Sequence, residues 1–275
     1  MRLSLCNEVL RDRPFAEQCA FAAALGYRGL EVAPFTLDEE PHRLPAGRIA
    51  GLRRDAAEAG IAITSLHWLL VTPPGLSITA AEAGVRQKTR DVIAGLIDLA
   101  AALGATHLVH GSPAQRMLPA GDEDAGRARA IEIFAFAAER AAAAGVTYCI
   151  EPLDPGQTNL INTVAEAAEI VRMIGSPALR TMIDICAAAR GETESPAELL
   201  ARWLPTGLIA HLHLNDANRR APGQGETRFG PILAAVQRAS FAGTLAVEPF
   251  DYVPDGAGAA AFAIGYLKGV TEGVA

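Results

Sequence analysis

The chain has 275 residues, half of them hydrophobic, and 31 acidic against 24 basic residues give a net charge of −7. That length fits one large α/β domain, whereas the acidic balance and the lack of a basic stripe argue against nucleic acid as a partner. The longest apolar stretches are rich in alanine and interrupted by charge, so we also expect no membrane span.

The cysteines and the first residues indicate a cytoplasmic protein. Cys6, Cys19, Cys149 and Cys186 lie far apart and form no C-x-x-C pair. Such a pattern is typical of reduced thiols rather than of a disulfide framework. The apolar part of the first residues is too short for a signal peptide, so we expect no secretion signal.

Short β-prone runs alternate with helix-like runs along the whole chain. The predicted strands cover residues 2–6, 30–33, 61–66, 106–110, 147–150, 179–183, 208–213 and 244–247. In the helix-like runs, apolar residues recur at steps of three and four; Val92, Leu96, Leu99 and Leu103 form one such face. Alternating strands and helices imply parallel strands joined by crossover helices.

Glycines mark the ends of the helix-like runs and come shortly before the predicted strands. Glycine is expected there because it accepts the left-handed conformation that often ends a helix. These glycines are Gly26, Gly60, Gly104, Gly145, Gly175, Gly207 and Gly243.

Eight strand–helix units in this length favour a closed (β/α)8 TIM barrel, with residues 1–275 as a single domain, over an open doubly wound sheet. The first strand is not followed by the G-x-G-x-x-G motif of dinucleotide-binding folds. Long strand-to-helix segments at residues 67–78, 111–122 and 215–230 are typical of the active-site end of such a barrel.

The fifth to the eighth predicted strands each end in a side chain that can bind a metal. These side chains are Glu151, Asp184, His213 and Glu248. Because side chains alternate along a strand, we expect all four to converge at one end of the barrel. Three buried carboxylates would repel one another unless a cation held them. His211 lies one layer deeper, and we expect it to support the site rather than bind the ion.

An oxygen-rich ligand set with one imidazole suits a single divalent metal ion. Mn²⁺ is the expected ion, with Mg²⁺, Co²⁺ and Zn²⁺ as alternatives. A structural zinc site would be expected to contain thiolates and to be closed by four protein ligands.

Four short motifs carry a resemblance that covers essentially the whole chain. They are IEP at residues 150–152, IDI at 183–185, HLHLNDANRR at 211–220 and VEPF at 247–250. With them the sequence resembles the sugar phosphate isomerase/epimerase superfamily, the xylose-isomerase-like barrels that include the ketose 3-epimerases. The resemblance implies the same four metal ligands, with Glu151 and Glu248 also acting as the catalytic pair across the substrate carbon. It further implies that Arg219 holds a substrate oxygen.

The chemistry of ketose isomerisation or epimerisation agrees with these roles. A proton must leave a carbon beside a carbonyl, and a metal ion can polarise that carbonyl and stabilise the enediolate. One glutamate would take the proton and the other return it from the opposite face. Two positions depart from the free-ketose 3-epimerases: Ala187 replaces a histidine and Gln157 replaces a glutamate. The expected substrate is therefore a small ketose or related polyol ketone of unspecified identity.

Other polar or aromatic side chains near the strand tips are candidate substrate contacts. His67 and Trp68 end the third strand and His110 ends the fourth, so all three are predicted to bind substrate. Asn7 and Glu31, near the first two tips, are weaker candidates for the same pocket. His107 has the opposite parity to His110 and is expected to be structural.

Alternative functions stay open at this point. The same proton abstraction followed by loss of hydroxide would make a dehydratase of a cyclic polyol ketone, of the inosose type. A non-catalytic sugar-binding barrel would have the same metal residues. Phosphodiester cleavage at abasic DNA would need a basic track, which the net charge disfavours. A Schiff-base aldolase needs a lysine at a strand tip, and both Lys88 and Lys268 lie in helix-like runs. Self-association into a homo-oligomer is left open.

Overall fold

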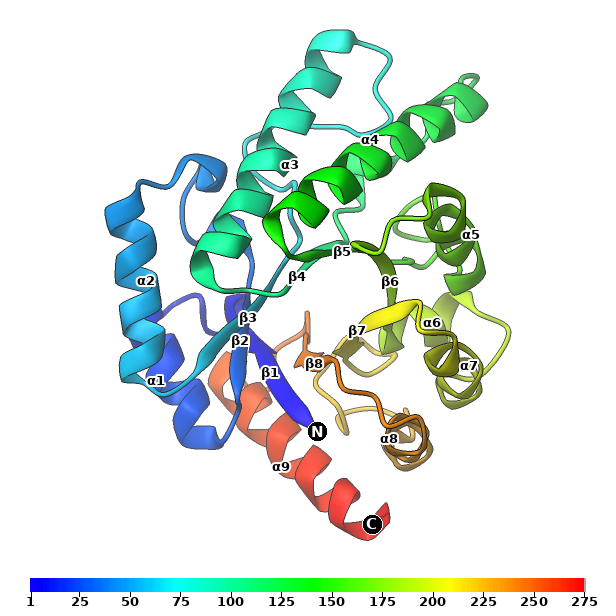
Figure 1. Cartoon of the computed structure of the whole chain (residues 1–275). Helices are drawn as coiled ribbons and strands as arrows, with labels where there is room; N and C mark the ends of the chain where they lie inside the picture. Colours follow the sequence, from blue (N-terminus) through cyan, green and yellow to red (C-terminus); the bar gives the residue numbers. More distant parts are fainter. Residues whose placement is uncertain (275) are drawn as a thin grey trace.

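A computed structural model describes residues 1–274 of the chain, and its strands form a closed parallel barrel in the order β1 to β8 (Figure 1). The strands are β1 (Arg2–Cys6), β2 (Gly29–Val32), β3 (Ala62–His67), β4 (His107–His110), β5 (Thr147–Ile150), β6 (Leu179–Asp184), β7 (Ile209–Leu214) and β8 (Thr244–Val247). Each predicted strand is present with its ends within one residue of the expected positions. The predicted TIM barrel is thus confirmed.

Helices surround the barrel on its outer side (Figure 1). They are α1 (Phe15–Leu25), α2 (Ala46–Glu58), α3 (Ala83–Leu103), α4 (Glu123–Ala144), α5 (Val164–Ile174), α6 (Ile185–Gly191), α7 (Pro196–Trp203), α8 (Phe229–Arg238) and α9 (Gly256–Val274). The barrel closes because β1 pairs with β8 in parallel, with Arg2 opposite Thr244. None of the helices in the described part of the chain has both the length and the apolar character needed to cross a bilayer.

The barrel has an inner and an outer layer of side chains. Val109, Cys149 and Met182 form a small apolar cluster of their own inside it. Outward-facing strand residues such as Leu108 and Leu212 join the main core, which lies between the strands and the helices. The inner cluster underlies the end of the barrel at which the strands finish, and it forms an apolar floor below the site.

Six of the seven marked glycines have positive φ, as predicted: Gly26, Gly60, Gly104, Gly145, Gly175 and Gly207. Gly243 does not, because the left-handed residue after α8 is Ser240, with φ 50°. Gly243 is needed for space instead: a Cβ there would lie 2.7 Å from the carbonyl oxygen of Ala210. The expectation for this one glycine was therefore wrong.

Candidate metal centre

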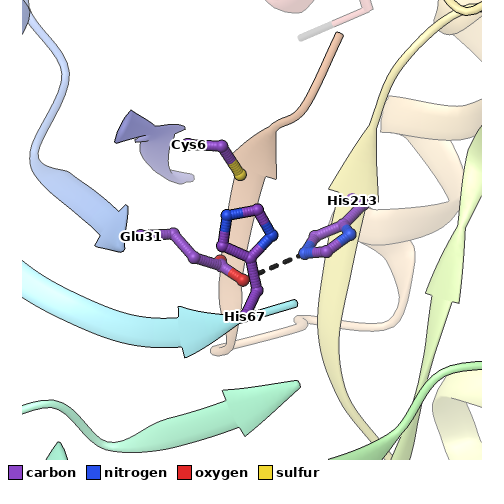
Figure 2. A group of neighbouring side chains, drawn as sticks. All are labelled: Cys6, Glu31, His67 and His213. Atoms are coloured by element: carbon purple, nitrogen blue, oxygen red, sulfur yellow. Dashed lines mark hydrogen bonds and ion pairs between the residues drawn. The ribbon is translucent and has the colours of Figure 1, made fainter. Parts of the chain in front are cut away.

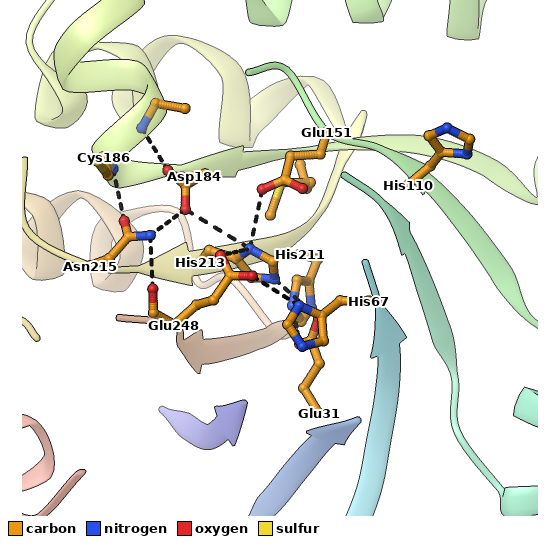
Figure 3. Close-up of polar contacts among 12 residues, drawn as sticks. Glu31, His67, His110, Glu151, Asp184, Cys186, His211, His213, Asn215 and Glu248 are labelled. Carbon is orange, nitrogen blue, oxygen red and sulfur yellow. Dashed lines mark hydrogen bonds and ion pairs between the residues drawn. The ribbon is translucent and has the colours of Figure 1, made fainter. Parts of the chain in front are cut away.

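The four predicted metal ligands meet at the C-terminal end of the barrel. Asp184 and His213 belong to β6 and β7, while Glu151 and Glu248 directly follow β5 and β8, and all four are buried. Nδ1 of His213 lies 3.2 Å from Oε1 of Glu151, 3.9 Å from Oδ2 of Asp184 and 2.8 Å from Oε2 of Glu248 (Figure 3). One donor atom from each residue therefore lies within 4.8 Å of the other three.

Three properties of this group fit a divalent cation. Nδ1 of His213 is buried and faces three carboxylates without meeting any of them in hydrogen-bond geometry, so an ion can take this nitrogen as a ligand. Burial, followed by repulsion from Glu151 and Glu248, raises the pKa of Asp184 from 3.8 to about 7. Such repulsion among buried carboxylates is removed when a cation lies between them. Three oxygens and one imidazole nitrogen are a suitable donor set for such an ion.

Glu31 fixes the orientation of the central histidine. Its Oε1 lies 3.0 Å from Nε2 of His213, and its Oε2 accepts a hydrogen bond from the Ser65 hydroxyl. Nε2 of His211 lies 2.6 Å from the same Oε2. A hydrogen bond from Nε2 to a carboxylate leaves Nδ1 as the atom that can bind metal. His211 is therefore a supporting residue, and Glu31, a weaker candidate in the sequence, is a direct partner of the site.

Asp184 is held by the start of the helix that follows it. Its Oδ1 accepts a hydrogen bond from the backbone N–H of Ala187, at the N-terminus of α6. Its Oδ2 accepts a second bond, 2.6 Å long, from the Asn215 side chain, which also donates to the backbone oxygen of Glu248. Asn215 thus ties β6 to β8. Asn215 directly follows β7, but no sequence pattern marks it as part of the site.

His67 contacts carboxylates in the structure. Its Nδ1 lies 2.9 Å from Oε1 of Glu248, and its Nε2 lies 3.0 Å from Oε2 of Glu8. The side chain is only 1% exposed. Figure 2 shows its ring between Cys6 and Glu31, close to His213. A substrate contact therefore stays a prediction for His67, whereas its support of Glu248 follows from these distances.

A cavity of about 250 Å³ opens onto both glutamates. Besides Glu151 and Glu248, its lining includes Trp68, Arg219 and Phe250. The rings of Trp68 and Phe250 meet edge to face, and the Arg219 guanidinium lies 5.0 Å from the centre of the Phe250 ring. Trp68 and Arg219 have φ values of 51° and 70°, which are unusual for residues other than glycine. Strained backbone at a cavity mouth is typical of functional sites.

Gly111 makes room for one of the glutamates. A Cβ at this position would lie 1.6 Å from Oε2 of Glu151. No side chain fits there unless the carboxylate moves, so glycine is required for the observed position of Glu151. No sequence pattern predicts this close approach, because Gly111 lies 40 residues before Glu151 in the chain.

His110 lies outside the barrel interior. Strand register pairs Val109 with the inward-facing Cys149, which turns His110 outward. Its Nδ1 lies 2.6 Å from the Tyr148 hydroxyl, and its ring packs on Phe134 of α4, apart from the metal ligands (Figure 3). Burial lowers the pKa of His110 to about 3, so the ring is neutral. This position does not fit the predicted substrate contact.

We expect His110→Leu to lower the free energy of unfolding by about 1–3 kcal/mol, because the Tyr148 hydroxyl loses its buried partner. Turnover and KM should stay within about twofold of the unmodified protein, since a structural hydrogen bond of this kind contributes to folding rather than to binding. Urea unfolding and steady-state kinetics check this. A raised KM with unchanged stability would instead place His110 in contact with substrate.

Comparisons with known proteins place the chain in a family. The model of the xylose isomerase-like TIM barrel family matches residues 19–269. The D-psicose 3-epimerase of Agrobacterium fabrum is 26% identical over 245 residues, covering 86% of this chain and 78% of that protein. The L-ribulose 3-epimerase of Mesorhizobium japonicum is 27% identical over 223 residues, covering 79% of this chain and 72% of that protein.

Solved structures have the same fold. The crystal structure of a D-psicose 3-epimerase in the presence of D-fructose has a TM-score of 0.83 at 20% identity. A 3-keto-D-glucoside 4-epimerase from E. coli has the same TM-score at 18% identity. In both comparisons 98% of this chain and 99% of the other chain are covered.

Proposed function

The chain belongs to the xylose isomerase-like TIM barrel family, and from this premise we propose that it is a divalent-metal-dependent epimerase of a small ketose or related polyol ketone. The observation that carries the proposal is the position of Glu151 and Glu248. Both line one cavity, and both converge with Asp184 on Nδ1 of His213. An epimerase needs such a pair, because inversion of a carbon requires proton transfer on two faces.

Glu151, Asp184, His213 and Glu248 would hold the ion, with Mn²⁺ as the expected metal and Mg²⁺, Co²⁺ or Zn²⁺ as alternatives. When bound, the ion supplies Lewis-acid polarisation of the substrate carbonyl. Glu31 keeps Nδ1 of His213 directed at the carboxylates, and Asn215 fixes Asp184. These contacts position the ligands before substrate arrives.

The proton transfers are assigned to the two glutamates. One carboxylate accepts the proton from the carbon beside the carbonyl, and the other donates a proton to the opposite face of that carbon. Their surroundings differ. Burial raises the pKa of Glu248, but His213 and His67 outweigh it and lower that pKa to about 2, which keeps this group ionised. Glu151 lies against Gly111, and its Oε1 lies 3.2 Å from Nδ1 of His213. Trp68 and Phe250 line the cavity with aromatic surface, which favours the exclusion of water once a substrate is bound.

The relatives support a ketose as the substrate class, since they are named for 3-epimerisation of D-psicose and L-ribulose. Gln157 and Ala187 lie at the same small pocket as Glu151 and Arg219. Because both differ from the residues of free-ketose 3-epimerases, the proposal does not extend to a particular ketohexose.

The test is proton exchange in D₂O with the manganese-loaded protein and a panel of free ketoses, ketose phosphates and inososes. We expect deuterium beside the carbonyl of one substrate, formation of its epimer, and loss of both after chelation. Loss of water from the product would identify a dehydratase, and exchange that survives chelation would contradict metal dependence.

Arg219 is the proposed anchor for a substrate oxygen. We expect Arg219→Ala to raise KM by about 10- to 100-fold with a smaller effect on kcat, because a hydrogen bond to a charged group contributes about 1.5–3 kcal/mol. Arg220→Ala is the matched control, since the neighbouring guanidinium pairs with Asp251 at 2.8 Å. Equal effects of the two substitutions would argue against a specific role for Arg219.

A further inference from the structure

The Glu248 carboxylate contacts two different groups of side chains with its two oxygens. Oε2 lies 2.8 Å from Nδ1 of His213, in the metal centre described above. Oε1 lies 2.9 Å from Nδ1 of His67, on the side of the barrel formed by β1 and β3. Glu248 therefore connects the metal centre to a second cluster of potential ligands.

That second cluster consists of Cys6, Glu8, His67 and Glu248. One donor atom from each lies within 4.8 Å of the other three, and all four residues are buried. Cys6 ends β1, Glu8 lies in the 3-10 turn Asn7–Leu10 that follows, and His67 ends β3. Oε1 of Glu8 is buried without a hydrogen-bond partner. Such an oxygen costs free energy unless something binds it.

The structure also brings Cys6 and His67 together with Glu31 and His213 (Figure 2). This alternative set is less suitable for an ion. Both oxygens of Glu31 are already engaged, by Nε2 of His213, Nε2 of His211 and the Ser65 hydroxyl. Nδ1 of His213 faces the other centre, so His213 would have to bind two ions at once. Glu8, in contrast, has a free buried oxygen.

The charges of the barrel interior favour a second cation. Five buried carboxylates line this region: Glu8, Glu31, Glu151, Asp184 and Glu248. One divalent ion offsets only two of these negative charges, and the buried imidazoles of His67 and His213, which face the same carboxylates, offset part of the rest. A second ion beside Glu8 would offset two more.

We propose that Cys6, Glu8, His67 and Glu248 form a second divalent-metal site, which shares Glu248 with the first. One sulfur, one nitrogen and two oxygens are a donor set for Zn²⁺ or Co²⁺, whereas the oxygen-rich first site suits Mn²⁺ or Mg²⁺. The ion would replace the hydrogen between Nε2 of His67 and Oε2 of Glu8, which are 3.0 Å apart, and Oε1 of Glu248 would leave Nδ1 of His67 to reach it. The two sites thus differ in the kind of metal that they select. The proposal does not depend on the reaction at the first site.

The test is a titration of the full-length, chelator-stripped protein with Co²⁺, followed by absorption spectroscopy and metal analysis. We expect two bound equivalents, one of which brings a thiolate-to-cobalt charge-transfer band in the near ultraviolet. Cys6→Ser should remove this band and keep the other equivalent. Glu8→Gln should weaken the equivalent that carries the band, and Asp184→Asn should weaken the one that does not.

Cys19→Ser is the matched control, because Cys19 is also a buried thiol but lies in α1, outside both clusters. It should leave the spectrum unchanged. Binding of a single equivalent without a sulfur band in the unmodified protein overturns the proposal, and this measurement needs no variant to fold. A band that persists in Cys6→Ser would also overturn it, since another thiol would then be the ligand.

Discussion

Glu151→Gln is expected to reduce epimerisation by about 100- to 10,000-fold, the range of a general acid or base, while deuterium exchange continues for one of the two epimers. Two opposed bases explain this outcome. The remaining glutamate still removes the proton from the epimer that presents it on the correct face, but no group returns a proton to the other face. Glu248→Gln should show the reverse preference. NMR of each pure epimer in D₂O, at saturating Mn²⁺, measures both effects.

Metal content must be determined for each of these variants, because both glutamates are also proposed ligands. Glu226→Gln is the control, since this exposed residue lies in the long loop after β7 and outside the cavity that the glutamates line. If both catalytic variants lost exchange from the same epimer, one glutamate would be the only base, and the two-base mechanism would be wrong.

Metal binding is expected to stabilise the protein more at about pH 8 than at about pH 5. In the metal-free protein Asp184 has a pKa of about 7, raised from 3.8 by burial and by its carboxylate neighbours. At a pH between 3.8 and about 7, Asp184 holds a proton in the folded state and has lost it in the unfolded state. The stability of the metal-free protein therefore falls as the pH rises through this range. One pKa unit corresponds to about 1.4 kcal/mol, and the loss therefore amounts to a few kcal/mol. An ion between the carboxylates removes this cost.

Thermal unfolding with and without Mn²⁺ at both pH values measures this difference. His107 and His110 have lowered pKa values, to about 4 and about 3, and they oppose the trend in the metal-free protein. Their contributions cancel in the metal-dependent difference, because neither belongs to the metal centre. Asp184→Asn should abolish most of the pH dependence, whereas Asp98→Asn, at an exposed ion pair with Arg140, should retain it. An equal gain at both pH values would contradict the repulsion described for Asp184.

The barrel and the convergence of four potential ligands could be predicted because both depend on local patterns. Short apolar runs followed by a charged residue fix each strand end, and parallel strands bring those ends to one side. Glu8, Asn215 and Gly111 could not be found in this way. Their roles depend on contacts between distant parts of the chain, such as the pair formed by Glu8 and His67, 59 residues apart.

The side chain of His110 points in another direction than the sequence predicts. Its place at the end of a strand suggested that it faces the cavity, as the neighbouring Glu151 does. Register decides otherwise: Val109 lies opposite Cys149, and His110 opposite Ile150. Because side chains alternate along a strand, a shift of one residue in register turns the last side chain of β4 toward the helices instead of the cavity. Sequence alone does not supply this offset, because strand pairing sets it.

The four proposed metal ligands lie in one half of the chain, and three of the residues that support the site lie in the other. Glu151, Asp184, His213 and Glu248 follow or end the strands β5 to β8, whereas Glu8, Glu31 and His67 belong to the segment from β1 to β3. A C-terminal half-barrel would therefore contain these ligands without Glu31 and His67, and an N-terminal half would contain Glu31 and His67 without the ligands. Complementation between two separately produced halves would restore a fully supported ion site only when both seams of the barrel, β4 with β5 and β8 with β1, had closed. The site thus doubles as a reporter of correct assembly.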